Sequence, residues 1–159
     1  LQKHIKLMLA VDKMLKKQPK AALDKIEEAK LWPRNLGVGK PYDEVIDTRL
    51  EDWLSFVAAE REGLKGQREH FLQRLVGSHV NTPEYQLLQS AAWHIAGDEA
   101  KARELADGWT AVQKDETALR RGKEFLGLVE RGEYASDTAL DFYKPLIHAL
   151  TAKADNRLF

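Results

Sequence analysis

The sequence contains no cysteine, and this absence excludes several kinds of chemistry. Disulfide bonds, thiolate metal sites and cysteine nucleophiles all need a thiol, so none of them can form within this chain. The redox compartment stays undetermined for the same reason, although a cytoplasmic location is slightly favoured. The chain also lacks any apolar run near the roughly 20 residues needed to cross a bilayer. We therefore expect a soluble chain with no membrane partner.

A surplus of charge of either sign is also absent, because 25 basic side chains face 25 acidic ones. Nucleic-acid binding needs a basic surplus to neutralise phosphates, so we expect no nucleic-acid partner. The charge is nevertheless unevenly spread: residues 1–30 hold eight lysines against four acids, and residues 41–62 hold seven acids against two arginines. We interpret these segments as two solvated helix faces that attract each other weakly when stacked.

Motifs for catalysis, nucleotide binding and metal binding are missing as well. The segment 37–40 (Gly-Val-Gly-Lys) is close to a phosphate-binding loop, but that motif needs glycine where Arg34 stands and serine or threonine where Pro41 stands. None of the five histidines belongs to a His-Glu-x-x-His motif or follows an acid by three residues. We therefore predict no enzyme activity, no cofactor and no metal site in this chain.

What the sequence does contain is apolar residues that recur every three or four positions, the spacing of amphipathic helices. We expect helices up to residue 18, over 20–31, from 43 or 47 to about 63–66, over 67–76 and 82–96, from 99 beyond 112, over 116–130, and from 137 beyond 150. Pro145 should kink or split the last of these. The segment 34–42 is the only long irregular stretch, since two glycines and a proline interrupt it.

Short turns are expected near residues 18, 66, 97 and 132, so the helices should form four pairs. The spacings are 48, 31 and 35 residues, and the first exceeds the others by about the length of the irregular segment. A helical period in the thirties is typical of a helix-pair solenoid. One such pair cannot bury its apolar stripe alone, and stacking supplies the core. The predicted fold is all-α, an α-α superhelix of about eight helices in a single domain over 1–159, curved into a shallow arc. The first helix of each pair should line its inner face.

Two segments resemble the second-helix half of the tetratricopeptide repeat (TPR). These are residues 97–105 (Gly-Asp-Glu-Ala-Lys-Ala-Arg-Glu-Leu) and residues 22–29, which Trp32 and Pro33 follow. The segment 32–41, with 49–52, is similar to a stretch of bacterial multi-domain proteins in which degenerate TPR-like repeats follow a large uncharacterised domain. The resemblance implies a helical interaction or accessory region and no catalytic residue. Because the chain starts inside a predicted helix, we expect it to be a piece of a longer protein.

The predicted function is a non-catalytic protein–protein interaction or scaffold module that binds a protein, a peptide or another domain of the same chain. The alternative is an accessory domain of a larger enzyme, such as a carbohydrate-active one, with its catalytic residues outside this chain. Loops on rigid scaffolds tend to carry contacts, so the candidate binding residues lie in or near the irregular segment: Arg34, Asn35, Lys40, Tyr42, Asp43, Arg49 and Trp53. The other interpretation of that segment is a connector packed on its neighbours.

Overall fold

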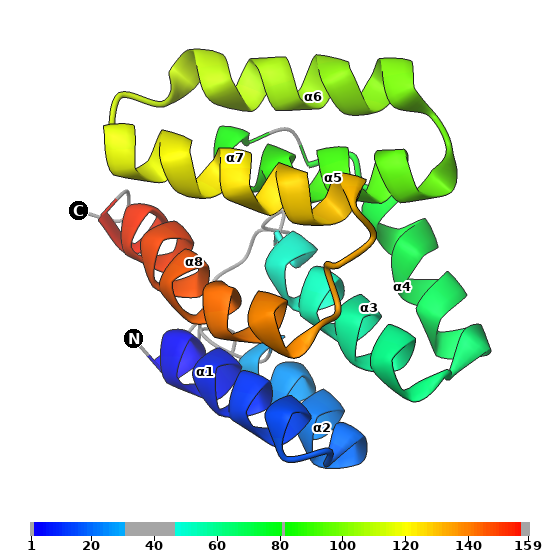
Figure 1. Cartoon of the computed structure of the whole chain (residues 1–159). Coiled ribbons are helices and arrows are strands. Elements are labelled where there is room, and N and C mark those ends of the chain that lie inside the picture. The colour runs from blue at the N-terminus through cyan, green and yellow to red at the C-terminus, as the bar shows by residue number, and fades with distance from the viewer. Residues whose placement is uncertain (1, 31–46, 81, 157–159) are drawn as a thin grey trace, which may run out of the picture.

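A computed structural model describes residues 2–30, 47–80 and 82–156 of the chain. These residues form eight α-helices and one short 3-10 turn, with no β-strand among them (Figure 1). In chain order the elements are α1 (Gln2–Leu15), α2 (Pro19–Lys30), α3 (Arg49–Glu62), α4 (Lys65–Val76), η2 (Pro83–Tyr85), α5 (Gln86–Ala96), α6 (Glu99–Val112), α7 (Glu116–Glu130) and α8 (Asp137–Asn156). The prediction of an all-helical fold is confirmed.

The first three of the four expected helix pairs pack as hairpins, whereas α7 and α8 make little contact with each other. The closest pairs are α1 with α2, α3 with α4, and α5 with α6. Glycines in the left-handed conformation end three helices: Gly63 (φ 67°), Gly97 (φ 98°) and Gly132 (φ 72°). A residue without a side chain adopts this conformation at no steric cost, which lets the chain reverse within a few residues. The turns at Gly97 and Gly132 lie where the sequence predicts them, and the turn expected near 66 lies at Gly63.

Helix α3 lies inside the molecule, and it is buried along its length from Arg49 to Ala59. It packs against α1, α2, α4 and α5. On its remaining side the indole of Trp53 meets the rings of Phe125 in α7 and Tyr143 in α8, with centroids 5.3 and 6.5 Å apart. The sequence predicts first helices that line an open inner face, but the partners of α3 fill that face. Even the charged residues in the first turn of α3 are buried, whereas a helix at the face of an open arc exposes its polar side to solvent.

The two ends of the described chain meet, because α1 packs along α8 (Figure 1). The rings of His4 and His148 lie edge to face with centroids 5.1 Å apart. Further along the same contact, Lys144 in α8 forms an ion pair with Asp12 in α1. The first and the last helix of the described chain are therefore neighbours, and the local sequence pattern does not predict this contact.

Two proline positions differ from expectation. Thr82 and Pro83 begin a 3-10 turn, and α5 starts only at Gln86. The Thr82 hydroxyl caps no helix and accepts a hydrogen bond from Arg49 instead. Pro145 does not split the last helix, since α8 runs without a break from residue 137 to 156. Tyr143 and Ile147, on either side of this proline, are both about 1% exposed, and their burial holds both halves of the helix in place.

Helices α6 and α7 approach each other most closely at a glycine. A Cβ added to Gly122 in α7 would lie closer than 3.0 Å to the six-membered ring of Trp109 in α6. Trp109 is one of only two buried residues of α6, and 3% of it is exposed. The flat ring therefore rests directly on the α7 backbone, a contact that only glycine permits.

Candidate functional site

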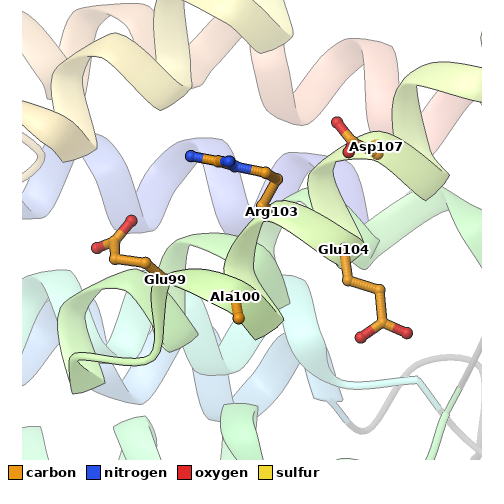
Figure 2. Close-up of a pocket in the computed structure, with 5 residues that line it drawn as sticks. All are labelled: Glu99, Ala100, Arg103, Glu104 and Asp107. Atoms are coloured by element: carbon orange, nitrogen blue, oxygen red, sulfur yellow. The ribbon is translucent and has the colours of Figure 1, made fainter.

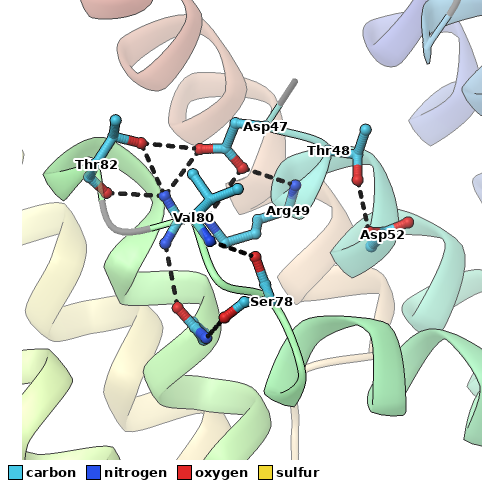
Figure 3. Close-up of polar contacts among 8 residues, drawn as sticks. Asp47, Thr48, Arg49, Asp52, Ser78, Val80 and Thr82 are labelled. Carbon is cyan, nitrogen blue, oxygen red and sulfur yellow. Dashed lines mark hydrogen bonds and ion pairs between the residues drawn. The ribbon is translucent and has the colours of Figure 1, made fainter. Parts of the chain in front are cut away.

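A buried arginine organises the beginning of α3. Arg49 is 1% exposed, and its guanidinium donates hydrogen bonds to three neighbouring segments (Figure 3). Two go to the carboxylate of Asp47, from Nε at 2.9 Å and Nη2 at 2.8 Å. Others reach the carbonyl and hydroxyl oxygens of Thr82, at 2.8 and 3.0 Å, and Oε1 of Gln89 in α5, at 3.2 Å. The hydrogen bonds offset the cost of burying a cation. They connect the beginning of α3 to Asp47, which precedes α3, to Thr82, which precedes α5, and to Gln89 within α5.

A buried carboxylate lies on the next turn of the same helix. Asp52 is 2% exposed and accepts a hydrogen bond from the hydroxyl of Thr48 at 2.9 Å. Lys30 at the end of α2 and Arg74 of α4 each place a nitrogen 3.0 Å from Oδ1 of the same carboxylate. One acid therefore joins α2, α3 and α4, and two cations offset the cost of burying it.

These two cations also border a shallow surface cleft of about 310 Å³. Its lining residues come from α2, α4 and the residue before α3: Glu27, Lys30, Thr48, His70, Phe71 and Arg74. Lys30 Nζ lies 5.3 Å from the centre of the Phe71 ring, within range of a cation–π interaction. The cleft thus combines a largely buried aromatic ring with two cations and one carboxylate, that of Glu27, which lies 3.3 Å from Lys30. Lys30 and Thr48 place it within two residues of both ends of segment 31–46.

The structure separates the predicted binding residues into two groups. Arg34, Asn35, Lys40, Tyr42 and Asp43 lie outside the described residues. Arg49 and Trp53 are described and each is 1% exposed, so the expectation that they contact a partner is corrected: Arg49 forms the network at the beginning of α3, and Trp53 packs in the aromatic core.

The acidic stretch around α3 also differs from expectation. The sequence predicts that the acids of residues 41–62 lie on a solvated face. In the structure, however, Glu51 and Asp52 are 0% and 2% exposed. Sequence reasoning missed Lys30 and Arg74 as partners of Asp52, and Gln89 as a partner of Arg49. These partners lie 22 to 40 positions away in the sequence, and the only local signal was the adjacent Asp47–Arg49 pair.

Two larger surface depressions do not gather side chains for chemistry. One, of about 510 Å³, is lined by Glu99, Ala100, Arg103, Glu104 and Asp107. Figure 2 shows that these side chains all come from α6 and spread to opposite sides of it. The other depression lies along α7 in the same way. Groups that diverge from one helix cannot hold a reacting atom between them.

Within residues 2–30, 47–80 and 82–156, no group of three or more His, Asp or Glu side chains is placed to hold a metal ion. In the same ranges, no helix combines the length and the apolar character needed to cross a membrane.

Two phenols with raised pKa values belong to the core. Burial raises the pKa of Tyr143 far above its ordinary value. Burial also raises the pKa of Tyr134, with a further contribution from the nearby carboxylate of Glu60. The Tyr143 hydroxyl donates to the backbone carbonyl of Tyr134, and Tyr134 donates to Glu60. These phenols fix the loop before α8 against α3 and face no cleft described above.

Comparisons of the chain with protein-family models, with curated proteins and with solved structures found no match. The resemblance to the tetratricopeptide repeat therefore stays a prediction. The function is therefore inferred from the site geometry alone.

Proposed function

We propose that this chain is a non-catalytic protein-interaction or scaffold module, and that the cleft between α2 and α4 is its contact surface. The observation that carries the proposal is that some charged residues only join helices, whereas others join helices and also border the cleft. Arg49 and Asp52 are buried and hold helices together, whereas Lys30 and Arg74 hold the buried acid and also border an open cleft. Small substrates bind in deep pockets. A shallow surface on a rigid helical body is better suited to binding a peptide or the surface of another protein.

The chemistry of the cleft indicates the kind of segment it would take. Its volume of about 310 Å³ accommodates a few side chains. Phe71 lines the cleft but is only 8% exposed, so it adds a small apolar surface, and the side chain of Arg74 is 44% exposed beside it. Arginine and aromatic residues are the side chains that most often carry binding energy at protein interfaces. An extended segment with an acidic residue next to an apolar one fits this arrangement.

Site-specific photo-crosslinking tests the proposal. A photoreactive amino acid replaces His70, an exposed residue that lines the cleft, and the matched control carries it at Glu124, an exposed position on α7. With extract of the source organism, the cleft position should give a discrete adduct with a protein, and the control should not. His70→Asp should then lower recovery of that protein, because it places a negative charge beside an acid-binding surface. Equal adducts at both positions, or none at either, would contradict the proposal.

A further inference from the structure

The molecule carries opposite charge excesses at its two ends. In the α1–α2 hairpin three lysines form ion pairs with acids: Lys6, Lys25 and Lys30. Four others gather at the α1–α2 turn and have no acidic partner within the described residues: Lys13, Lys16, Lys17 and Lys20. The last three are exposed. Lys17 adopts a left-handed backbone conformation (φ 58°), which directs it out of the regular helix.

Two exposed apolar side chains lie on the same hairpin. Ile5 and Leu9 are 44% and 39% exposed, and their spacing of four places them on one face of α1. Lys16 follows Leu9 by seven residues and lies in the turn directly after α1. The end of the molecule formed by α1 and α2 therefore presents an apolar pair bordered by free lysines, a pattern suited to an acidic helical surface.

Helix α6 forms the opposite edge of the molecule (Figure 1). Only Ala102 and Trp109 of its residues are buried. The side turned away from the core carries small and acidic residues at helical spacing: Ala100, Glu104, Asp107 and Ala111, all exposed. Over residues 98–116 the chain holds six acids against three bases. Figure 2 shows Glu104 on one side of Ala100 and Arg103 with Asp107 on the other, so a shallow trough runs along α6.

We propose that the chain associates head to tail with a second copy of itself, the lysine-rich end of α1 and α2 in one copy docking on α6 of the next. The two surfaces are complementary in charge, and the apolar pair on α1 matches the small residues in the trough of α6. Pairing like surfaces would bring like charges together, so the contact is heterologous and not two-fold symmetric. The overall net charge of zero allows such stacking to continue without accumulating charge. This inference does not depend on the α2–α4 cleft.

Sedimentation velocity of the whole chain over a range of concentrations and salt tests the proposal. The weight-average mass should rise with protein concentration at low ionic strength. Salt screens exposed charges over about 10 Å at 0.1 M, so association should weaken about tenfold or more when salt is raised to about 0.5 M. A chain that stays monomeric under all these conditions would overturn the proposal. If the chain stays monomeric and its α1–α2 lysines bind a polyglutamate peptide, the proposal is also overturned, because the partner of these lysines is then an acidic segment of another protein.

Charge exchange between the two surfaces provides the sharper test. A head variant (Lys16→Glu, Lys17→Glu, Lys20→Glu) and a tail variant (Glu104→Lys, Asp107→Lys) should each stay monomeric where the natural chain associates. A mixture of the two should associate again, because the reversed head now complements the reversed tail; this recovery also shows that both variants are folded. The control Lys65→Glu, Lys123→Glu reverses exposed charges elsewhere and should associate normally. Failure of the mixture to associate, or loss of association in the control, would overturn the proposal.

Discussion

The contact between Trp109 and Gly122 allows a quantitative test of the packing between α6 and α7. In an isolated helix, replacing glycine by alanine is favourable by about 0.5–1 kcal/mol because it reduces backbone freedom in the unfolded chain. At Gly122 the new methyl group would lie inside the contact distance of the buried indole ring. Overpacking of this kind costs about 1–3 kcal/mol. We expect Gly122→Ala to lower the free energy of unfolding by about 1–2 kcal/mol.

The same helix supplies a matched control. A Cβ at Gly127 would meet only the end of the flexible Arg131 side chain, with Nη1 at 3.1 Å. That side chain can move, so Gly127→Ala should keep the helix-propensity gain of about 0.5 kcal/mol. The two variants should therefore differ by about 2 kcal/mol. At about 2–4 °C per kcal/mol for a chain of this size, the midpoints of thermal unfolding should differ by about 4–8 °C.

Urea and thermal unfolding followed by circular dichroism measure this difference. The double variant Gly122→Ala, Trp109→Phe should recover part of the loss, because the smaller ring leaves space for the methyl group, and a double-mutant cycle isolates that coupling. If Gly122→Ala is as stable as Gly127→Ala, the Trp109 ring does not rest on the α7 backbone, and the packing described between α6 and α7 is wrong.

Three further predictions concern the polar and phenolic groups of the interior. Arg49→Leu leaves buried acceptors without a donor and should cost about 3–5 kcal/mol in urea unfolding, whereas Arg120→Leu on the exposed face of α7 should change stability by less than about 0.5 kcal/mol. Asp52→Asn keeps the size of the side chain but removes the charge between two cations, and a loss of about 1–3 kcal/mol is expected in the same assay; an unchanged midpoint would show that the carboxylate is not needed. The raised pKa values of Tyr134 and Tyr143 mean that the unfolded chain releases these protons at lower pH than the folded chain does. Stability should therefore be unaffected by these groups below about pH 10 and should fall as the pH rises beyond it, and ultraviolet titration should show Tyr143 ionising only with unfolding and Tyr134 ionising above the ordinary pKa of a phenol.

Local features of the fold could be predicted from the sequence because local residues determine them. Gly97 and Gly132 reverse the chain where they stand, and periodic apolar residues between such turns specify helices. The C-terminal boundary of α3 near residue 63 follows from the same reasoning. These signals depend on neighbours within one or two turns, so they do not need knowledge of the packing.

The arrangement of the helices and the role of the charged residues could not be predicted. Gln89, which accepts a hydrogen bond from Arg49, lies 40 residues from it in the sequence, and no local pattern reveals such a contact. Two neighbouring acids such as Glu51 and Asp52 are typical of a solvated helix face. They are buried here because other helices pack over them, and the local sequence does not show that packing. The sequence of α3 mixes apolar residues with charged ones that are also buried, such as Arg49 and Asp52, so its periodicity does not mark it as the central helix. The meeting of α1 and α8 depends on the sum of all the turns between them.

Amide hydrogen exchange in the folded state tests the central claim, that α3 is the interior helix around which the other pairs pack. The backbone amides of residues 53–59 should exchange last, at the rate set by global unfolding, while those of the edge helix α6 should exchange much earlier through local opening. Exchange of residues 53–59 as early as that of α6 would contradict the account, because a helix enclosed by its neighbours cannot open alone.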